Sequence, residues 1–343
     1  MAPSETFLRL QELGRKSREA GSAVDAAALP SASVLEREFG LFDPTRAGCL
    51  PTVDATTGAV SCACAGCERW KRYITGTLGE GWPTFPQYEV ITADYVTQLA
   101  RYLRRRRLEI LGADEPRPLR VLELGAGDGR LTRHLREHLD GHGIEMCATD
   151  DHSLGLAKGD AKGGHHGVVA ADALDAVSQC GFSREPTTAV SSSSSSSSSS
   201  SLPGACDVAL VCWQPMGVDW TAAIRASASF QEYVLVGEVD DGICGDPSAT
   251  WGVCADDSGD SGGGGGGEGT SEGDLDVAYA SDGWSRVDVT EELGGRQICR
   301  TDERWLMGRR SRTTSFRRVD VDAASVPVRV EPKASSQSAC VST

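Results

Sequence analysis

The segment Val121–Leu131 places a Gly-rich turn directly after an apolar run, an arrangement suited to binding a charged ligand. Its sequence, VLELGAGDGRL, reads as a short buried strand that carries Glu123, a turn with glycines at every second position from Gly125 to Gly129, and the start of a helix. Glycine allows the backbone to approach a ligand closely, and a helix N-terminus offers N–H groups and a partial positive charge to a carboxylate. We therefore expect this loop to bind the carboxylate end of a cofactor.

The spacing of these glycines separates two classes of Rossmann-like protein. Dinucleotide-binding enzymes carry G-x-G-x-x-G, which would require a third glycine where this chain has Arg130. The spacing here is G-x-G-x-G, with Glu123 two positions before the first glycine. This pattern resembles the first motif of the class I S-adenosylmethionine-dependent methyltransferases. The resemblance implies an enzyme that uses S-adenosyl-L-methionine; an NAD(P)-type oxidoreductase and a non-catalytic scaffold of the same fold are the alternatives.

Apolar runs alternate with helical patterns after Leu119, as in an α/β protein with a doubly wound, mostly parallel sheet. Strands are expected at 120–124, 144–149, 167–171, 207–213, 232–237, 284–289 and 313–319, and helices at 92–103, 130–139 and 220–229. The last two strands read as an antiparallel pair. Over residues 72–320 this pattern resembles the seven-stranded methyltransferase sheet, which implies the strand order 3-2-1-4-5-7-6 with helices on both faces.

The resemblance also assigns the parts of the cofactor to positions in this chain. The ammonium group would meet Glu123, and the two ribose hydroxyls would meet a carboxylate at the end of the second strand. Asp150 is the first choice for the ribose and Asp151 the next, although either could instead cap a turn. The expected cofactor-binding residues are Glu123, Gly125, Ala126, Gly127, Asp128, Gly129, Asp150, Asp151, Asp172, Ala173, Cys212 and Trp213.

The loop after the fourth strand is where the resembled fold brings the cofactor and the methyl acceptor together. Gln214, Pro215 and Met216 are therefore substrate candidates. They share only a polar residue before proline with the Asn/Asp-Pro-Pro-Tyr motif of nitrogen methyltransferases, so nitrogen specificity is not implied. The alternative is that Trp213 and Trp220 simply pack a strand-to-helix turn.

Acidic residues after the fifth strand are the other substrate candidates. Glu238 and Asp240 follow this strand, and ligands of parallel sheets bind outside the carboxyl ends of the strands. The alternative is a solvated loop. The expected reaction is in-line transfer of the sulfonium methyl group, for which the protein mainly supplies orientation and a dehydrated pocket. The sequence identifies neither the acceptor nor a general base.

The net charge and the hydropathy of the chain limit which partners and which cellular location we expect. The formal net charge is −15, so no broad basic field exists for a nucleic acid, and the run Arg104–Arg107 reads as a solvated helix face. We therefore favour a protein or small molecule over RNA as the methyl acceptor. No apolar run is long enough to predict a membrane span, and acidic residues near the N-terminus argue against a targeting peptide. A cytoplasmic or nuclear protein is expected.

Composition divides the chain into three parts. Residues 1–71 are expected to hold an N-terminal helix at 4–19 and a loosely ordered segment, residues 72–320 the methyltransferase domain, and residues 321–343 a disordered tail. Flexible insertions are expected near 183–204, which contains a serine tract, and 242–274, which contains a glycine tract.

Four cysteines, Cys49, Cys62, Cys64 and Cys67, lie close together in the N-terminal part. Cys64-x-x-Cys67 has half of the ligand spacing of a zinc site, but the other two thiols are poorly spaced for the second half. The sequence therefore favours incidental reduced cysteines and no metal, with a zinc site as the alternative.

Overall fold

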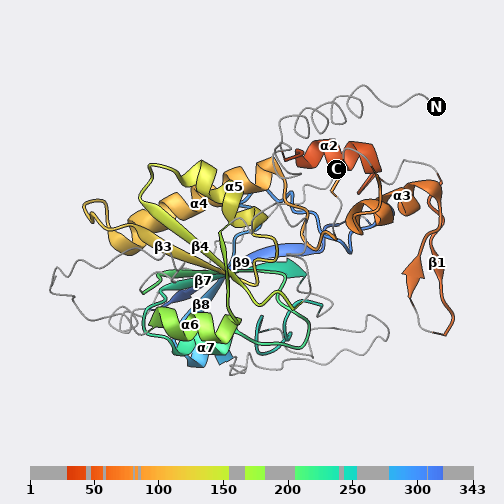
Figure 1. Cartoon of the computed structure of the whole chain (residues 1–343). Coiled ribbons are helices and arrows are strands. Elements are labelled where there is room, and N and C mark those ends of the chain that lie inside the picture. Colours follow the sequence, from red (N-terminus) through yellow and green to blue (C-terminus); the bar gives the residue numbers. More distant parts are fainter. Residues whose placement is uncertain are drawn as a thin grey trace, which may run out of the picture.

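A seven-stranded sheet forms the centre of the computed structural model (Figure 1). Its spatial order is β5 (Val168–Ala170), β4 (Ile144–Asp150), β3 (Leu119–Leu124), β6 (Val208–Cys212), β7 (Glu232–Glu238), β9 (Ser311–Arg318) and β8 (Trp284–Asp288). The first five strands are parallel, and β9 runs antiparallel to both β7 and β8. In order along the chain this is 3-2-1-4-5-7-6 with an antiparallel final pair, so the predicted topology is confirmed.

The structure describes most of the sheet and its helices but not the low-complexity tracts. The described residues are 29–43, 48–56, 59–79, 82–83, 86–153, 167–181, 205–238, 243–252, 278–306 and 308–319. The predicted N-terminal helix, both predicted insertions for the most part, and the predicted tail lie outside these residues. Within them, no helix has both the length and the apolar character needed to cross a membrane.

Helices cover both faces of the sheet because its strands carry apolar side chains on both faces. Leu119 and Val121 of β3 pack with α4 (Ala93–Leu111) and α5 (Arg130–Leu139), while Leu122 and Leu124 pack toward α6 (Ala173–Gly181) and α7 (Thr221–Ala226). Figure 1 shows these two helix pairs on opposite sides of the strands. A short helix, α8 (Ala278–Ser281), precedes β8.

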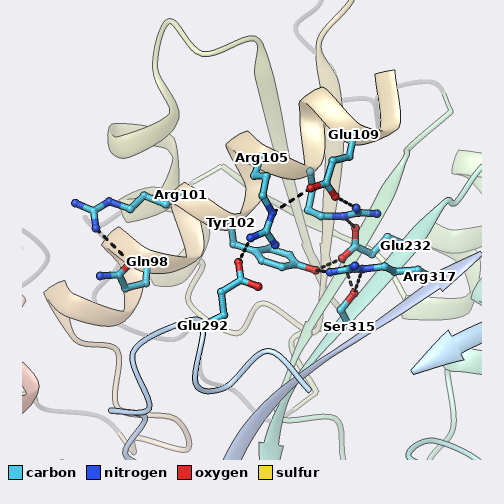
Figure 2. Close-up of polar contacts among 10 residues, drawn as sticks. Gln98, Arg101, Tyr102, Arg105, Glu109, Glu232, Glu292, Ser315 and Arg317 are labelled. Atoms are coloured by element: carbon cyan, nitrogen blue, oxygen red, sulfur yellow. Dashed lines mark hydrogen bonds and ion pairs between the residues drawn. The ribbon is translucent and has the colours of Figure 1, made fainter. Parts of the chain in front are cut away.

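The arginine run in α4 binds other groups of the same domain, and Figure 2 shows this for Arg105, which pairs with Glu109 and Glu292. Arg106 is buried, and its Nε donates to Glu232 Oε2 at 2.5 Å; Tyr102 and Ser315 also donate to this fully buried carboxylate. The expectation of a solvated helix face is therefore wrong for Arg106. The other three arginines make contacts of their own: Arg104 with the His138 carbonyl, Arg105 with Glu109 and Glu292, and Arg107 with the Gly143 and Glu115 carbonyls.

The N-terminal part contains more ordered structure than the sequence suggested. It forms α2 (Ala32–Phe39), a two-stranded hairpin of β1 (Thr52–Val53) and β2 (Val60–Ser61), and α3 (Ala65–Ile74). Phe39 of α2 packs against Trp70 and Tyr73 of α3, and the apolar cluster that they form includes Ile298 of the main domain. The division expected between residues 71 and 72 therefore falls inside a helix that packs on the domain, because the aromatic face of α3 needs an apolar partner.

Candidate functional site

A cavity of about 710 Å³ opens where the carboxyl ends of the parallel strands meet. This volume lies in the usual range for a small-molecule site. Most predicted site residues share its wall: Glu123, Gly125, Ala126, Gly127, Asp128, Asp150, Asp151, Asp172, Ala173, Cys212, Trp213, Gln214, Pro215 and Met216. The topology therefore brings loops from four parallel strands around one space.

The Gly-rich loop bends tightly over the end of β4. Gly125 and Gly127 have φ of 64° and 57°, values that side chains disfavour, and a Cβ at Gly125 would lie 2.9 Å from the Trp220 ring. The Ala126 N–H donates to the Thr149 carbonyl at 2.9 Å, and the Gly127 N–H donates to Asp150 Oδ2 at 2.8 Å. These two N–H groups therefore hold the loop to the neighbouring strand.

Gly129 has a different position from the rest of the motif. It is the N-cap of α5 with φ of 75°, and it is not among the described residues that line the cavity. Gly129 has no side chain that could accept a hydrogen bond from the first turn of the helix. The Arg130 N–H donates instead to Asp128 Oδ1 at 3.1 Å. The glycine lets the chain turn into the helix, while the residues before it face the cavity.

Glu123 faces the cavity and also links β3 to α5 by hydrogen bonds. Only 2% of this residue is exposed, and its Oε2 accepts the Thr132 N–H at 3.1 Å and a second bond from the Thr132 hydroxyl. Burial raises the pKa of Glu123 to about 7, against these hydrogen bonds, which lower it. The buried carboxyl thus has a protein partner that the sequence did not reveal.

The acidic residues at the carboxyl ends of β4 and β5 hold their own loops. Asp150 accepts the His152 N–H at 2.7 Å in addition to the Gly127 N–H. Asp151 accepts the Ser153 N–H at 2.9 Å, which is the main reason why its pKa is lowered. Asp172 Oδ1 caps α6 through the Leu174 N–H at 2.8 Å. All three carboxylates nevertheless line the cavity, so the capping alternative and a ligand contact are compatible.

The loop after β6 forms the opposite wall and holds one unusual backbone conformation. Trp213 has φ of 60°, which is rare for a bulky residue and recurs at functional sites. The Gln214 side chain is buried with 3% exposure, and its Nε2 donates to the Val218 carbonyl at 2.5 Å. Its Oε1 is buried without a hydrogen-bond partner among the described residues. A ligand N–H or O–H would satisfy this oxygen.

Sequence reasoning missed the third wall, which comes from the segment before α4. Glu89 is buried, accepts from the Trp213 indole N–H at 2.9 Å and from the Ser311 hydroxyl at 2.8 Å, and lines the cavity. Burial raises its pKa to about 8, so its carboxyl is mostly protonated at neutral pH. The available signal was one acidic residue inside the run Tyr88–Ile91.

The same segment recruits a second stretch of chain to the cavity. Glu89 forms an isolated antiparallel bridge with Cys299, and the Arg300 N–H donates to the Tyr88 carbonyl at 2.9 Å. The Arg300 guanidinium lies 4.7 Å from the centre of the Tyr88 ring, and both residues line the cavity with Thr301. These residues are about 200 positions apart in the sequence, so no local pattern joins them.

The two acidic substrate candidates after β7 have different outcomes. Glu238 is fully buried and is not among the described lining residues; it pairs with Arg310 at 3.1 Å and accepts from the Thr301 hydroxyl at 2.8 Å. It therefore supports the cavity wall through Thr301, because a buried carboxylate needs a cationic partner. Asp240 lies outside the described residues.

Comparison with known proteins finds only structural neighbours of low similarity. No protein-family model matches the sequence, and no curated protein matches it. Three similar solved structures are the CurJ carbon methyltransferase (14% identity, TM-score 0.35, 65% of this chain and 54% of that chain), the mitomycin 7-O-methyltransferase MmcR (11%, 0.30, 92% and 69%) and the N-terminal domain of human METTL16 in complex with SAH (10%, 0.33, 85% and 95%). The chain thus spans about half the length of the CurJ structure.

The order and direction of the strands identify the fold without these comparisons. Five parallel strands in the order 3-2-1-4-5 are followed by an antiparallel pair in which the last strand inserts between the fifth and the sixth. The chain has the Rossmann-like fold of the class I methyltransferases.

Proposed function

We propose that this chain is an S-adenosyl-L-methionine-dependent methyltransferase whose acceptor is a protein side chain or a small molecule. One observation carries the proposal: the Gly-rich loop and the acidic residues at the carboxyl ends of β4 and β5 face a single cavity of about 710 Å³. Each was selected from the sequence for a different part of this cofactor. Their arrangement around one space is what a single bound molecule requires.

The lining fits the cofactor at both ends. Trp220 lies over Gly125, where a Cβ would come within 2.9 Å of the indole ring, so glycine at this position leaves room for an aromatic side chain of the cavity wall. Glu123 would meet the ammonium group, Asp150 or Asp151 the ribose hydroxyls, and Asp172 with Ala173 the adenine. The bound cofactor would supply an already activated methyl group, so the chain would mainly orient the acceptor and exclude water.

The wall formed by Glu89, Trp213 and Gln214 would orient the methyl acceptor. The unpartnered Gln214 Oε1 can accept a hydrogen bond from an N–H or O–H of the acceptor. Glu89 can take up a proton only when it is ionised, and its pKa of about 8 makes that fraction grow with pH. The net charge of −15 disfavours a polyanionic acceptor such as RNA.

Calorimetry on the purified chain tests cofactor binding. We expect heat with S-adenosylmethionine and with S-adenosylhomocysteine, and none with NAD, because the Arg130 side chain at the third dinucleotide position binds Asp128 and Gln87. Asp150→Asn should weaken binding about tenfold or more by removing charge-assisted bonds. Glu145→Gln is the matched control, since Glu145 lies on the same strand but is exposed.

Transfer of a tritiated methyl group to fractionated cell extract tests catalysis. Labelled acceptor should appear with the wild-type chain and decline with Asp150→Asn. Cofactor binding without any transfer would favour the non-catalytic scaffold, and binding of NAD instead of S-adenosylmethionine would favour the oxidoreductase. Absence of binding by a folded chain to either S-adenosyl compound would refute the proposal.

A further inference from the structure

Four cysteine sulfur atoms meet beside the N-terminal hairpin, outside the cavity described above. The Sγ atoms of Cys49, Cys62, Cys64 and Cys67 all lie within 4.8 Å of one another. The Cys49 sulfur lies 3.6 Å from the Cys64 sulfur and 3.7 Å from the Cys67 sulfur. All four are free thiols. The spacing that looked unsuitable in the sequence therefore closes into one cluster.

Two local elements bring the sulfur atoms together. Cys49 precedes the β1–β2 hairpin and Cys62 follows it, and the pairing of Thr52 with Ser61 brings the two ends of the hairpin side by side. Cys64 is the N-cap of α3, and Cys67 lies in the first turn of that helix. The hairpin thus supplies the half of the site that the sequence spacing lacked.

The distances suit a tetrahedral metal better than a disulfide. In a tetrahedral zinc site with Zn–S bonds of about 2.3 Å, neighbouring sulfur atoms lie about 3.8 Å apart. The separations of 3.6 and 3.7 Å are close to this value. A disulfide needs about 2.05 Å and joins sulfur atoms in pairs, whereas here all four sit around one centre.

We propose that these four cysteines bind one structural zinc ion. Zinc prefers thiolate ligands, and a set of four cysteines leaves no open position for a substrate. The four thiols give up their protons as the thiolates bind the ion, and no oxidation or reduction occurs.

Nearby positive charge suits a site of this kind. Zinc with four thiolates carries a net charge of −2, and Arg304 Nη1 lies 3.3 Å from the Cys64 sulfur. A Cβ at Gly66 would lie 1.8 Å from the same Arg304 atom, so glycine there leaves room for the guanidinium.

The position of the cluster indicates what the ion would stabilise. All four strand residues of the hairpin are exposed, and a two-stranded hairpin is marginal in water by itself. On its other side α3 contacts the loop that lines the cavity, since the Trp70 indole N–H donates to the Asp302 carbonyl at 2.5 Å. Zinc would therefore fasten the hairpin to α3 and, through Arg304 and Trp70, to the loop carrying Arg300 and Thr301.

Metal analysis of the full chain tests the proposal. Protein purified under reducing conditions should contain about one zinc ion per chain by inductively coupled plasma mass spectrometry. A mercurial reagent, which reacts with thiolate ligands, should release this zinc. Cys64→Ser and Cys67→Ser should lose most of this zinc. Cys147→Ala is the matched control, because Cys147 is a buried cysteine of the sheet core and lies outside the cluster.

A second measurement avoids the risk that the variants fail to fold. Metal-depleted wild-type protein titrated with Co²⁺ should develop the visible absorption of tetrahedral tetrathiolate cobalt, saturating at about one ion per chain. Added zinc should also slow proteolysis in the hairpin. The proposal is overturned if the folded protein holds no zinc and gives no such absorption. Disulfides among these four cysteines in freshly purified, unreduced protein would overturn it too.

Discussion

Replacing Gly125 and Gly141 by alanine, one at a time, should distinguish the cost of backbone strain from the cost of overpacking. At Gly125, φ is 64° and a new Cβ would lie 2.9 and 3.1 Å from two atoms of the Trp220 ring. At Gly141, φ is 70° but a Cβ would meet nothing within 4 Å. Both variants therefore carry the strain of a side chain in the left-handed region, about 1–2 kcal/mol, but only Gly125→Ala also overpacks.

The expected difference follows from the Trp220 contact. Overpacking costs about 1–3 kcal/mol, so Gly125→Ala should lower the free energy of unfolding by about 2–5 kcal/mol and Gly141→Ala by about 1–2 kcal/mol. Urea denaturation followed by circular dichroism measures both. Because Trp220 and Gly125 both line the cavity, calorimetry should also show weaker S-adenosylmethionine binding for Gly125→Ala only. Equal destabilisation by the two substitutions, with unchanged binding, would refute this reasoning.

Three further predictions concern buried polar groups. The pKa of Glu89 rises on folding from 4.5 to about 8, so the folded state favours the neutral carboxyl. The stability that this preference contributes is lost as pH rises from about 5 to about 8. In urea titrations, the Glu89→Gln variant should therefore lose less stability over this pH range than the wild-type chain. Arg106→Met leaves Glu232 buried without its cation and should lower the free energy of unfolding by about 3–5 kcal/mol. Arg105→Met removes an exposed ion pair and should lower it by less than about 1 kcal/mol. Similar losses for the two variants in thermal and urea unfolding would contradict this. Gln214→Met should leave cofactor affinity within about twofold but lower kcat/KM for methyl transfer about tenfold, and an unchanged kcat/KM would exclude Gln214 from contact with the acceptor.

Local sequence pattern predicted the framework of the site well. Helix α5 spans Arg130–Leu139, the predicted bounds, and Thr92 caps α4 by accepting the Tyr95 N–H at 3.2 Å. Such features depend on residues within one or two turns of each other, so they can be read from a single segment. The carboxyl ends of parallel strands meet at one edge, which is why acidic residues chosen separately share one cavity.

Contacts between distant segments were the ones that the sequence could not predict. Glu238 and Glu89 are both acidic residues near apolar runs, yet Arg310 draws the first into a buried ion pair while Trp213 and Ser311 hold the second at the cavity. The partners of Glu89 lie 124 and 222 positions away. No spacing rule covers such distances.

The sequence by itself determined the alternation of strands and helices, the glycine turn and the acidic strand ends, because hydrophobic period and backbone freedom act over neighbouring residues. Only the tertiary structure decided which charges are buried in pairs, which carboxyl faces the cavity, and that four scattered thiols converge. Those outcomes depend on how the sheet, the N-terminal helices and the loop after Ile298 pack, since burial and pairing energies arise only when distant surfaces exclude water together.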